Sequence, residues 1–229
     1  YVCFDGQKPE DCNAGNALVV LSNGNYNPVA LEQIDSDVIN ALIATEDRNF
    51  YEHNGVDKQG LARALVQESV ELITEQDIRA DQGGSTITMQ LLRNIYVDVV
   101  PENDLERKKW ELEHAPQFEE VYSKEEILLK YLNVVNYGRG AYGIENGAQM
   151  YFGKSANDLT IPEAAELVAT VNGPGLYEGS NDPDRNNTQM TNLLERRNKI
   201  INDLAEAGYI TQKDADEIHK LAPLNALPY

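Results

Sequence analysis

A helical recurrence of apolar residues runs through most of this chain and restricts it to a fold built largely from α-helices. Val38, Leu42 and Ile43 recur at helical spacing directly after Asp35 and Ser36, two residue types that cap helix N-termini. Similar spacing returns in later segments, and no internal repeat or low-complexity segment interrupts it. The fold class predicted from the sequence is therefore mainly α.

Start and stop signals divide this helical part into separate elements. Leu61 and Leu65 mark a second helix, and a third is expected to begin with Ser85 as its N-cap and to run to about residue 96. A fourth covers about 103–115 and is expected to stop before Pro116, because the residue before a proline disfavours helical backbone.

Capping boxes mark two further helix starts. In each, a Ser or Thr stands three residues before a Glu, so that each side chain can bond the backbone N–H of the other residue. The pairs are Ser123 with Glu126 and Thr160 with Glu163. A closing pair of helices is expected over about 188–207 and 211–221, on either side of Gly208.

The N-terminal stretch, residues 1–33, reads as extended and loop-like, with one short strand expected over 17–21. Its two cysteines, Cys3 and Cys12, are close enough in sequence to form a small disulfide loop. Such a bond would fit export to an oxidising compartment. Two surface thiols are the alternative.

The length of 229 residues suits one medium-sized domain, which the helical signals place at 34–221, followed by a tail or linker at 222–229. The chain has 38 acidic and 19 basic residues, so its net charge is −19. A field of that sign repels nucleic acid, and a phosphate-bearing ligand therefore needs a local cationic cluster or a metal ion. The candidate cluster consists of Arg93, Arg107, Lys108 and Lys109.

No membrane-spanning helix is expected within the chain, since no apolar run reaches about 18 residues. No secretory signal peptide is visible either. The chain starts at Tyr1 without Met, which indicates a processed or trimmed protein.

A dense polar cluster follows the first predicted helix, contains Glu46 and Asp47, and ends at Asp57. Glu46 stands where a buried element meets a loop, so apolar neighbours would disfavour its charged form. A carboxylate in that environment suits a general base. The alternative is a helix end with solvated charges, since acidic residues are common in such places.

A second cluster starts with Gly83-Gly84 and continues into the third predicted helix. The N-terminus of this helix would present free N–H groups behind the two glycines, an arrangement that binds anions. Its polar residues that share one face are Thr86, Gln90, Arg93 and Asn94. An ordinary amphipathic helix after a Gly-Gly turn is the alternative.

A third cluster places Arg107 and Lys108 on one helical face with Glu111. The order is basic before acidic, which is the weaker orientation for stabilising a helix and mildly favours a binding site over a structural ion pair. A solvated helix face is the alternative.

In combination, the clusters resemble motifs of the bacterial peptidoglycan glycosyltransferases (glycosyltransferase family 51), found in bifunctional penicillin-binding proteins and in monofunctional transglycosylases. Glu-Asp-x-x-Phe-x-x-His-x-Gly spans 46–55, Gly-x-Ser-Thr-x-Thr-x-Gln spans 83–90, and Arg-Lys-x-x-Glu spans 107–111. A Tyr-Gly-Arg-Gly motif at 137–140 and a Glu-Ala-Ala helix at 163–165 follow in the family's order.

The resemblance implies a lysozyme-like fold, with a larger head lobe and a smaller membrane-proximal jaw lobe, that polymerises glycan strands from lipid II. Glu46 would deprotonate the acceptor 4-hydroxyl, which attacks with inversion to form a β-1,4 link and release polyprenyl pyrophosphate. Glu111 would be a second catalytic carboxylate that holds a divalent cation (Mg²⁺ or Mn²⁺) or orients the pyrophosphate. The residues expected to bind substrate are Asp47, Arg48, His53, Ser85, Thr86, Gln90, Arg93, Asn94, Arg107 and Lys108.

The resemblance also implies that Asp47 and His53 buttress Glu46, whereas Phe50 is expected in the core. Residues 58–82 would form a mobile flap or jaw region that touches the membrane; packing against the main lobe is the alternative. Its apolar side chains would be Val70, Leu72, Ile73 and Ile78.

The expected location is the extracytoplasmic face of the bacterial cell membrane, with any membrane anchor outside this chain. The expected partners are lipid II, the growing lipid-linked glycan strand, the membrane surface, a fused transpeptidase domain and other cell-wall synthesis proteins. No nucleic acid is expected among them.

Several residues depart from the family's usual types, and they put the rate in question more than the identity. The departures are Asn49, Met89, Arg93 and Trp110. Two other functions are weighed. A lysozyme-like lytic enzyme would need a carboxylate pair but no pyrophosphate clamp, so the cationic residues on motif positions argue against it. A non-catalytic scaffold that binds lipid II is supported only by the departures.

Overall fold

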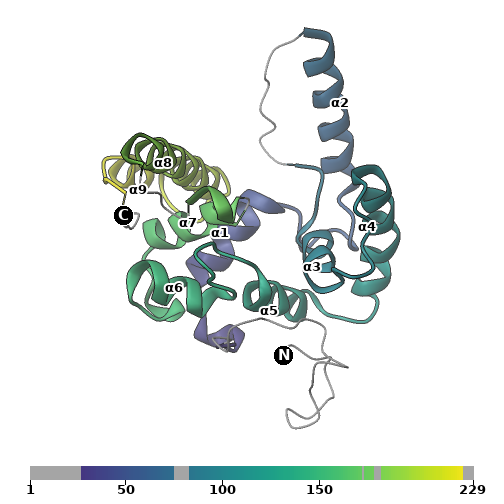
Figure 1. Cartoon of the computed structure of the whole chain (residues 1–229), viewed down its shortest axis with the longest axis horizontal. Helices are drawn as coiled ribbons and strands as arrows, with labels where there is room; N and C mark the ends of the chain where they lie inside the picture. The colour runs from purple at the N-terminus through teal and green to yellow at the C-terminus, as the bar shows by residue number, and fades with distance from the viewer. Residues whose placement is uncertain (1–26, 75–82, 172, 178–181, 224–229) are drawn as a thin grey trace. The chain divides into compact units, whose positions relative to one another are not determined.

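The computed structural model of the chain describes residues 27–74, 83–171, 173–177 and 182–223 (Figure 1). Within these ranges the structure is helical, with one isolated bridge between Asn136 and Tyr142 and no β-strand. The mainly α prediction is confirmed, and a lysozyme-like fold is consistent with it. The predictions for Cys3, Cys12 and the strand at 17–21 lie outside the described residues.

The described residues fall into two compact units. One runs up to Thr45 and resumes at Leu132, and the other is Glu46–Tyr131. The chain passes from one unit to the other within two helices, α1 (Ser36–Glu46) and α5 (Lys124–Val134). All three of the clusters singled out above lie in the unit Glu46–Tyr131.

This unit contains α2 (Lys58–Thr74), α3 (Ile87–Ile95) and α4 (Asp104–Glu119), and α3 packs against α4. The turn before α3 lies against α2. The approach is close, since a Cβ added to Gly84 would lie 3.2 Å from the Cβ of Ala64. Helix α3 is almost enclosed, with six of its nine residues buried. The packing of these buried residues therefore fixes the directions in which Gln90 and Arg93 leave the helix.

The first part of the predicted flap forms α2 (Figure 1). The side chains of Val70, Leu72 and Ile73 and the whole of Ile78 lie outside the described residues. Among the described helices, none combines the length and the apolar character needed to cross a bilayer.

The predicted N-cap of α3 is wrong by one residue. Thr86, not Ser85, caps the helix, and its hydroxyl accepts a hydrogen bond from the N–H of Met89. The hydroxyl of Ser85 instead accepts from the ammonium of Lys108, at 2.9 Å. The two neighbouring hydroxyls therefore have different partners, one within the helix and one on a distant segment.

The predicted end of the fourth helix is also wrong, since α4 continues through Pro116 to Glu119. Proline removes one donor from the helix, but the helical bonding resumes after it, and the N–H of Glu120 donates to the Pro116 carbonyl at 3.1 Å. Ala115 and Phe118, on either side of the proline, are buried. Tertiary packing thus overrides the local tendency to stop.

The other unit contains α6 (Ile144–Phe152), α7 (Ile161–Thr170), α8 (Pro183–Glu206) and α9 (Gln212–Ile218). Helix α8 packs against both α7 and α9 (Figure 1). It begins five residues before the predicted start at 188, because Asp182 caps it and Pro183 occupies its first turn.

Both predicted capping boxes are confirmed. Glu126 accepts from the N–H of Ser123 at 2.7 Å, and Glu163 accepts from the N–H of Thr160 at 2.9 Å. The predicted core position of Phe50 is confirmed as well, since its side chain is fully buried.

A buried arginine holds the segment that follows α9. Arg197 of α8 has no exposed surface and donates to the carbonyls of Leu221 and Ala222, at 2.9 and 3.0 Å. Its charge is balanced by Glu166 of α7, at 3.7 Å. Through these contacts the side chain joins α8, α7 and the segment after α9.

Candidate active site

Glu46 is the last residue of α1, and its side chain is only 9% exposed. The amide nitrogen of Gln90 on α3 donates to its Oε2 at 3.1 Å. The hydroxyl of Tyr131 donates to the amide oxygen of Gln90 at 2.9 Å. Because Tyr131 takes the oxygen end of the amide, the NH₂ end must face Glu46, and one carboxylate oxygen is held in place.

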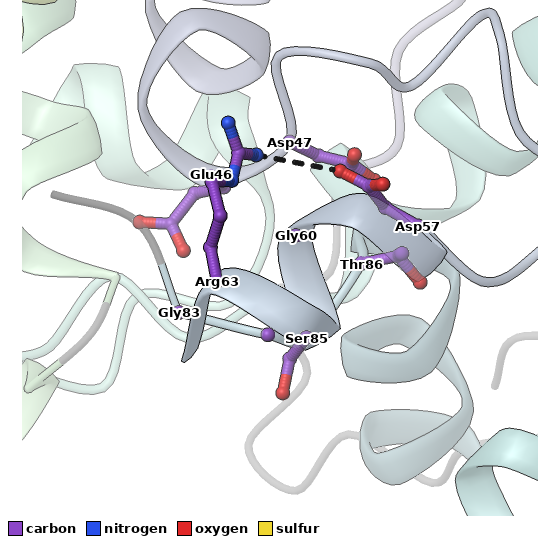
Figure 2. A pocket seen from close by; sticks show the side chains of 9 residues that line it. Glu46, Asp47, Asp57, Gly60, Arg63, Gly83, Ser85 and Thr86 are labelled. Carbon is purple, nitrogen blue, oxygen red and sulfur yellow. Dashed lines mark ion pairs between the residues drawn. The ribbon is translucent and has the colours of Figure 1, made fainter. Parts of the chain in front are cut away.

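Glu46 lines a pocket together with the turn at 83–86 and the start of α2 (Figure 2). Arg63 of α2 reaches across this pocket toward Asp57, and the two form an ion pair at 3.7 Å. Neither residue was predicted from the sequence to have a role. Asp57 closes the first polar cluster, whereas Arg63 lies on a helix with no motif around it.

Asp57 is held in its charged form. Burial by itself would raise the pKa of Asp57, but the backbone N–H of Gly60 and the amide of Asn49 donate to it and hold the pKa below its ordinary value. The Asn49 bond is 3.0 Å long. Asn49, one of the departures from the family's usual types, therefore supports a second carboxylate at the pocket of Glu46.

Asp47 fixes the start of α3. Its Oδ2 accepts from the backbone N–H of Ile87 at 3.0 Å, and both of its oxygens lie 3.0 Å from Nε2 of His53. A carboxylate at a helix N-terminus is favoured by the helix dipole. Asp47 and His53 thus support Glu46 through the helix that carries Gln90.

The N-terminus of α3 is less open to an anion than the sequence predicts. Asp47 takes the N–H of Ile87, and the Thr86 hydroxyl takes that of Met89. The same hydroxyl donates to the carbonyl of Gly55 at 2.7 Å. The protein's own side chains fill these positions because orphan N–H groups in a buried turn need acceptors.

A cationic cluster surrounds the second glutamate. Glu111 of α4 is fully buried, and its Oε1 accepts from Nε and an NH₂ group of Arg93 at 2.8 and 2.6 Å. Arg107 Nε lies 3.8 Å from Oε1, and Lys108 Nζ lies 3.8 Å from Oε2. The predicted common face of these residues is confirmed, and one buried carboxylate organises three cations.

Helix α3 connects the two glutamates. Gln90 holds Glu46 and Arg93 holds Glu111, and the two α3 residues lie three positions apart on one face. The Glu46 carboxylate and the cluster of cations are therefore linked through α3, which carries one partner of each. This arrangement can accept a proton at one end and neutralise an anion at the other.

Comparison with known proteins decides the family. The transglycosylase family matches residues 14–204 of the chain. The chain belongs to the transglycosylase family. The family assignment made from the motifs is confirmed, and with it the identification of the domain as an enzyme of this kind.

Relatives of this transglycosylase domain include penicillin-binding proteins. It is 39% identical over 189 residues to penicillin-binding protein 1A of Aquifex aeolicus and 40% identical over 190 residues to that of Escherichia coli. These matches cover 82% and 83% of this chain but only 24% and 21% of the relatives. The chain therefore spans about a quarter of the length of the relatives it matches.

A solved structure is also similar, penicillin-binding protein 1A from Haemophilus influenzae. The two share 18% sequence identity with a TM-score of 0.44, over 89% of this chain and 18% of that one.

A divalent cation at Glu111 fits the transglycosylase site poorly. Mg²⁺ and Mn²⁺ prefer several oxygen ligands, and no group of three or more His, Cys, Asp or Glu side chains in the described parts of the chain is placed to hold a metal. Oε2 of Glu111 is buried without a hydrogen bond, but three cationic side chains already lie within 4 Å of the carboxylate. The three cationic side chains offset the charge of this carboxylate.

Two of the residues predicted to bind substrate are more exposed than Glu46 and Glu111. Arg48 is exposed at the start of the turn after α1, and Asn94 is half-buried near the end of α3. Their roles in binding stay predictions. The residues that local sequence reasoning missed are Asp57, Arg63, Glu119, Lys124 and Tyr131.

Proposed function

We propose that this transglycosylase polymerises peptidoglycan glycan strands from lipid II, with Glu46 as the general base. The observation that carries the proposal is the pairing on α3, where Gln90 aims the Glu46 carboxylate and Arg93 joins the cationic cluster around Glu111. The names of the matched relatives, penicillin-binding proteins, support a role in the cell wall.

In the proposed reaction, the 4-hydroxyl oxygen of lipid II attacks the anomeric carbon of the lipid-linked chain. The bond from that carbon to the pyrophosphate oxygen breaks as the new carbon–oxygen bond forms on the opposite face, so an α-linked donor gives a β-1,4 link. The hydroxyl proton passes to the carboxylate of Glu46. A positioned base is needed because a sugar hydroxyl is a poor nucleophile.

The cationic cluster is suited to the departing pyrophosphate. Arg93 is 42% exposed and Arg107 28% exposed, so a ligand can reach both, whereas the buried Glu111 fixes where their charges lie. Lys108 is more constrained, because its ammonium already donates to Gly84 and Ser85. Preorganised cations of this kind stabilise charge that develops in the transition state.

The proposal includes the setting of the reaction. The substrates would be lipid II and the growing lipid-linked strand, at the extracytoplasmic surface of the bacterial membrane. A transpeptidase domain and other cell-wall synthesis proteins are the proposed partners, since the relatives are about four times longer than the matched segment.

The test is incubation of the purified protein with fluorescent lipid II in detergent, with the products separated on a gel. A ladder of glycan polymers is the expected result. Binding of lipid II without polymer would favour a scaffold, and shortening of preformed glycan would favour a lytic enzyme.

The rate of polymer synthesis is expected to fall at alkaline pH, at a lower pH than the loss of charge from an ordinary lysine would give. Burial lowers the pKa of Lys108, and the nearby Arg93 and Arg107 lower it further against the opposing pull of Glu111. The ammonium is therefore lost at lower pH than in an ordinary lysine. Lys108→Arg, which stays charged, should move this alkaline limb upward in a pH–rate profile. Lys109→Arg on the exposed neighbour is the control, and a limb unchanged in Lys108→Arg would contradict the assignment.

Removal of divalent cations is expected to change the rate by less than about threefold, because three cationic side chains already compensate the charge at Glu111. The measurement compares initial rates in EDTA with those in added Mg²⁺ or Mn²⁺ at constant ionic strength. A loss of about tenfold or more in EDTA, restored by either ion, would instead support the metal predicted from the family.

A further inference from the structure

We propose that Glu119 and Lys124 are positioning residues, which hold His53 neutral with its proton on Nε2 and thereby fix Asp47 against α3. The inference rests on the proposed function, since its kinetic readout is polymer synthesis. Its spectroscopic readout does not depend on that function.

His53 is enclosed by charged groups. Its side chain is 7% exposed, and Nε2 lies 3.0 Å from both oxygens of Asp47. On the other side of the ring, Nδ1 lies 3.4 Å from Nζ of Lys124 and 4.0 Å from Oε1 of Glu119. The ring therefore bridges the end of α1 and the start of α5.

The partners decide the tautomer. A carboxylate accepts hydrogen bonds only, so the proton between His53 and Asp47 belongs to Nε2. An ammonium donates only, so Nδ1 facing Lys124 must be the unprotonated nitrogen. The hydrogen-bonding pattern thus assigns a neutral imidazole that accepts from Lys124 and donates to Asp47.

Glu119 holds Lys124 in this place. Its Oε2 lies 2.6 Å from Nζ of Lys124, and its Oε1 accepts from the hydroxyl of Thr88 at 2.5 Å. The ammonium also lies 4.5 Å from the centre of the Phe50 ring. Lys124 is therefore fixed by a carboxylate and an aromatic face, and Glu119 is tied directly to α3.

The network holds the first turn of α3 at two points. Asp47 takes the N–H of Ile87, and Glu119 takes the hydroxyl of Thr88. The same helix carries Gln90, which aims Glu46. A shift of this turn would displace the donor to the base, and small displacements of catalytic groups lower rates strongly.

Lys124→Met tests the proposal. Without the ammonium, Glu119 loses its partner and becomes the acceptor for Nδ1, so the imidazole should carry protons on both nitrogens at neutral pH. We expect imidazole ¹⁵N NMR to show one protonated and one bare nitrogen for His53 in the parent protein, and two protonated nitrogens in the variant. The kcat for polymer synthesis should fall about 10- to 100-fold with little change in KM for lipid II.

Lys130→Met is the matched control, because Lys130 lies on the same helix and also stacks over an aromatic ring, that of Tyr122, at 4.6 Å. It should leave the His53 signals and kcat as in the parent. The double variant Glu119→Gln with Lys124→Met removes both charges beside Nδ1, so it should return the neutral imidazole signals and part of kcat.

Two results would overturn the proposal. One is a parent protein in which Nδ1 of His53 is protonated, a measurement that needs no variant. The other is a folded Lys124→Met with parental signals and kcat. If the parent makes no polymer while its His53 signals are as expected, the proposed function fails and the neutral tautomer stands.

Discussion

Glu46→Gln is expected to lower the rate of polymer synthesis by about 100- to 10,000-fold, the usual contribution of a positioned general base. The amide keeps the shape of the side chain and an oxygen that can accept from Gln90, but it cannot take a proton from the acceptor hydroxyl. Binding of lipid II should remain close to that of the parent, since the cationic cluster lies around Glu111 and is untouched.

Single-turnover measurements with fluorescent lipid II separate these two effects. Glu52→Gln is the matched control, because it makes the same change on an exposed carboxylate of the loop that follows. It should retain most of the rate. A Glu46→Gln protein that polymerises within a few-fold of the parent would assign the base to another group.

Gly55→Ala is expected to destabilise the fold by about 3 kcal/mol or more, because it combines backbone strain with a clash. Gly55 has φ +79°, which is unfavourable for a residue with a Cβ. An added Cβ would also lie 2.4 Å from the carbonyl carbon of Ala115 and 2.6 Å from the nitrogen of Pro116. Both are backbone atoms of α4, which cannot rotate away as a side chain can, so α4 itself would have to move.

Two other glycines separate the strain from the clash. Gly153 has φ +65° and open space at the Cβ position, whereas Gly175 has open space and no positive φ. Unfolding in urea should give the largest loss for Gly55→Ala, about 1 kcal/mol for Gly153→Ala and close to none for Gly175→Ala. A loss for Gly55→Ala no larger than that for Gly153→Ala would show that the approach to α4 is not tight.

Much of this fold follows from local chemistry that can be read along the sequence. The capping box at Ser123 and Glu126 and the one at Thr160 and Glu163 act within a single turn, so the sequence shows both partners. Ser85, the expected cap of α3, instead bonds Lys108, which lies more than 20 positions away and is not indicated by the local pattern. The continuation of α4 through Pro116 depends on burial, which no local pattern states.

In the candidate site, too, contacts within one helix could be predicted from the sequence and contacts between helices could not. Arg107 and Lys108 share a helix with Glu111, and their common face was predictable from spacing alone. The bonds from Gln90 to Glu46 and from Arg93 to Glu111 join separate helices, and only the resemblance to a family placed these residues in one site. Tyr131 and Lys124 lie in a stretch where the sequence shows only a capping box and a helix, so their contacts appear only in three dimensions.

Inverting transfer to a sugar hydroxyl is tested most directly by turnover of lipid II labelled with ¹³C at the anomeric carbon that bears the pyrophosphate. We expect one new β-1,4 link for each polyprenyl pyrophosphate released, with the bond configuration read by NMR of the polymer. Release of pyrophosphate with free reducing sugar, or an α configuration in the product, would contradict an inverting transfer to a sugar hydroxyl.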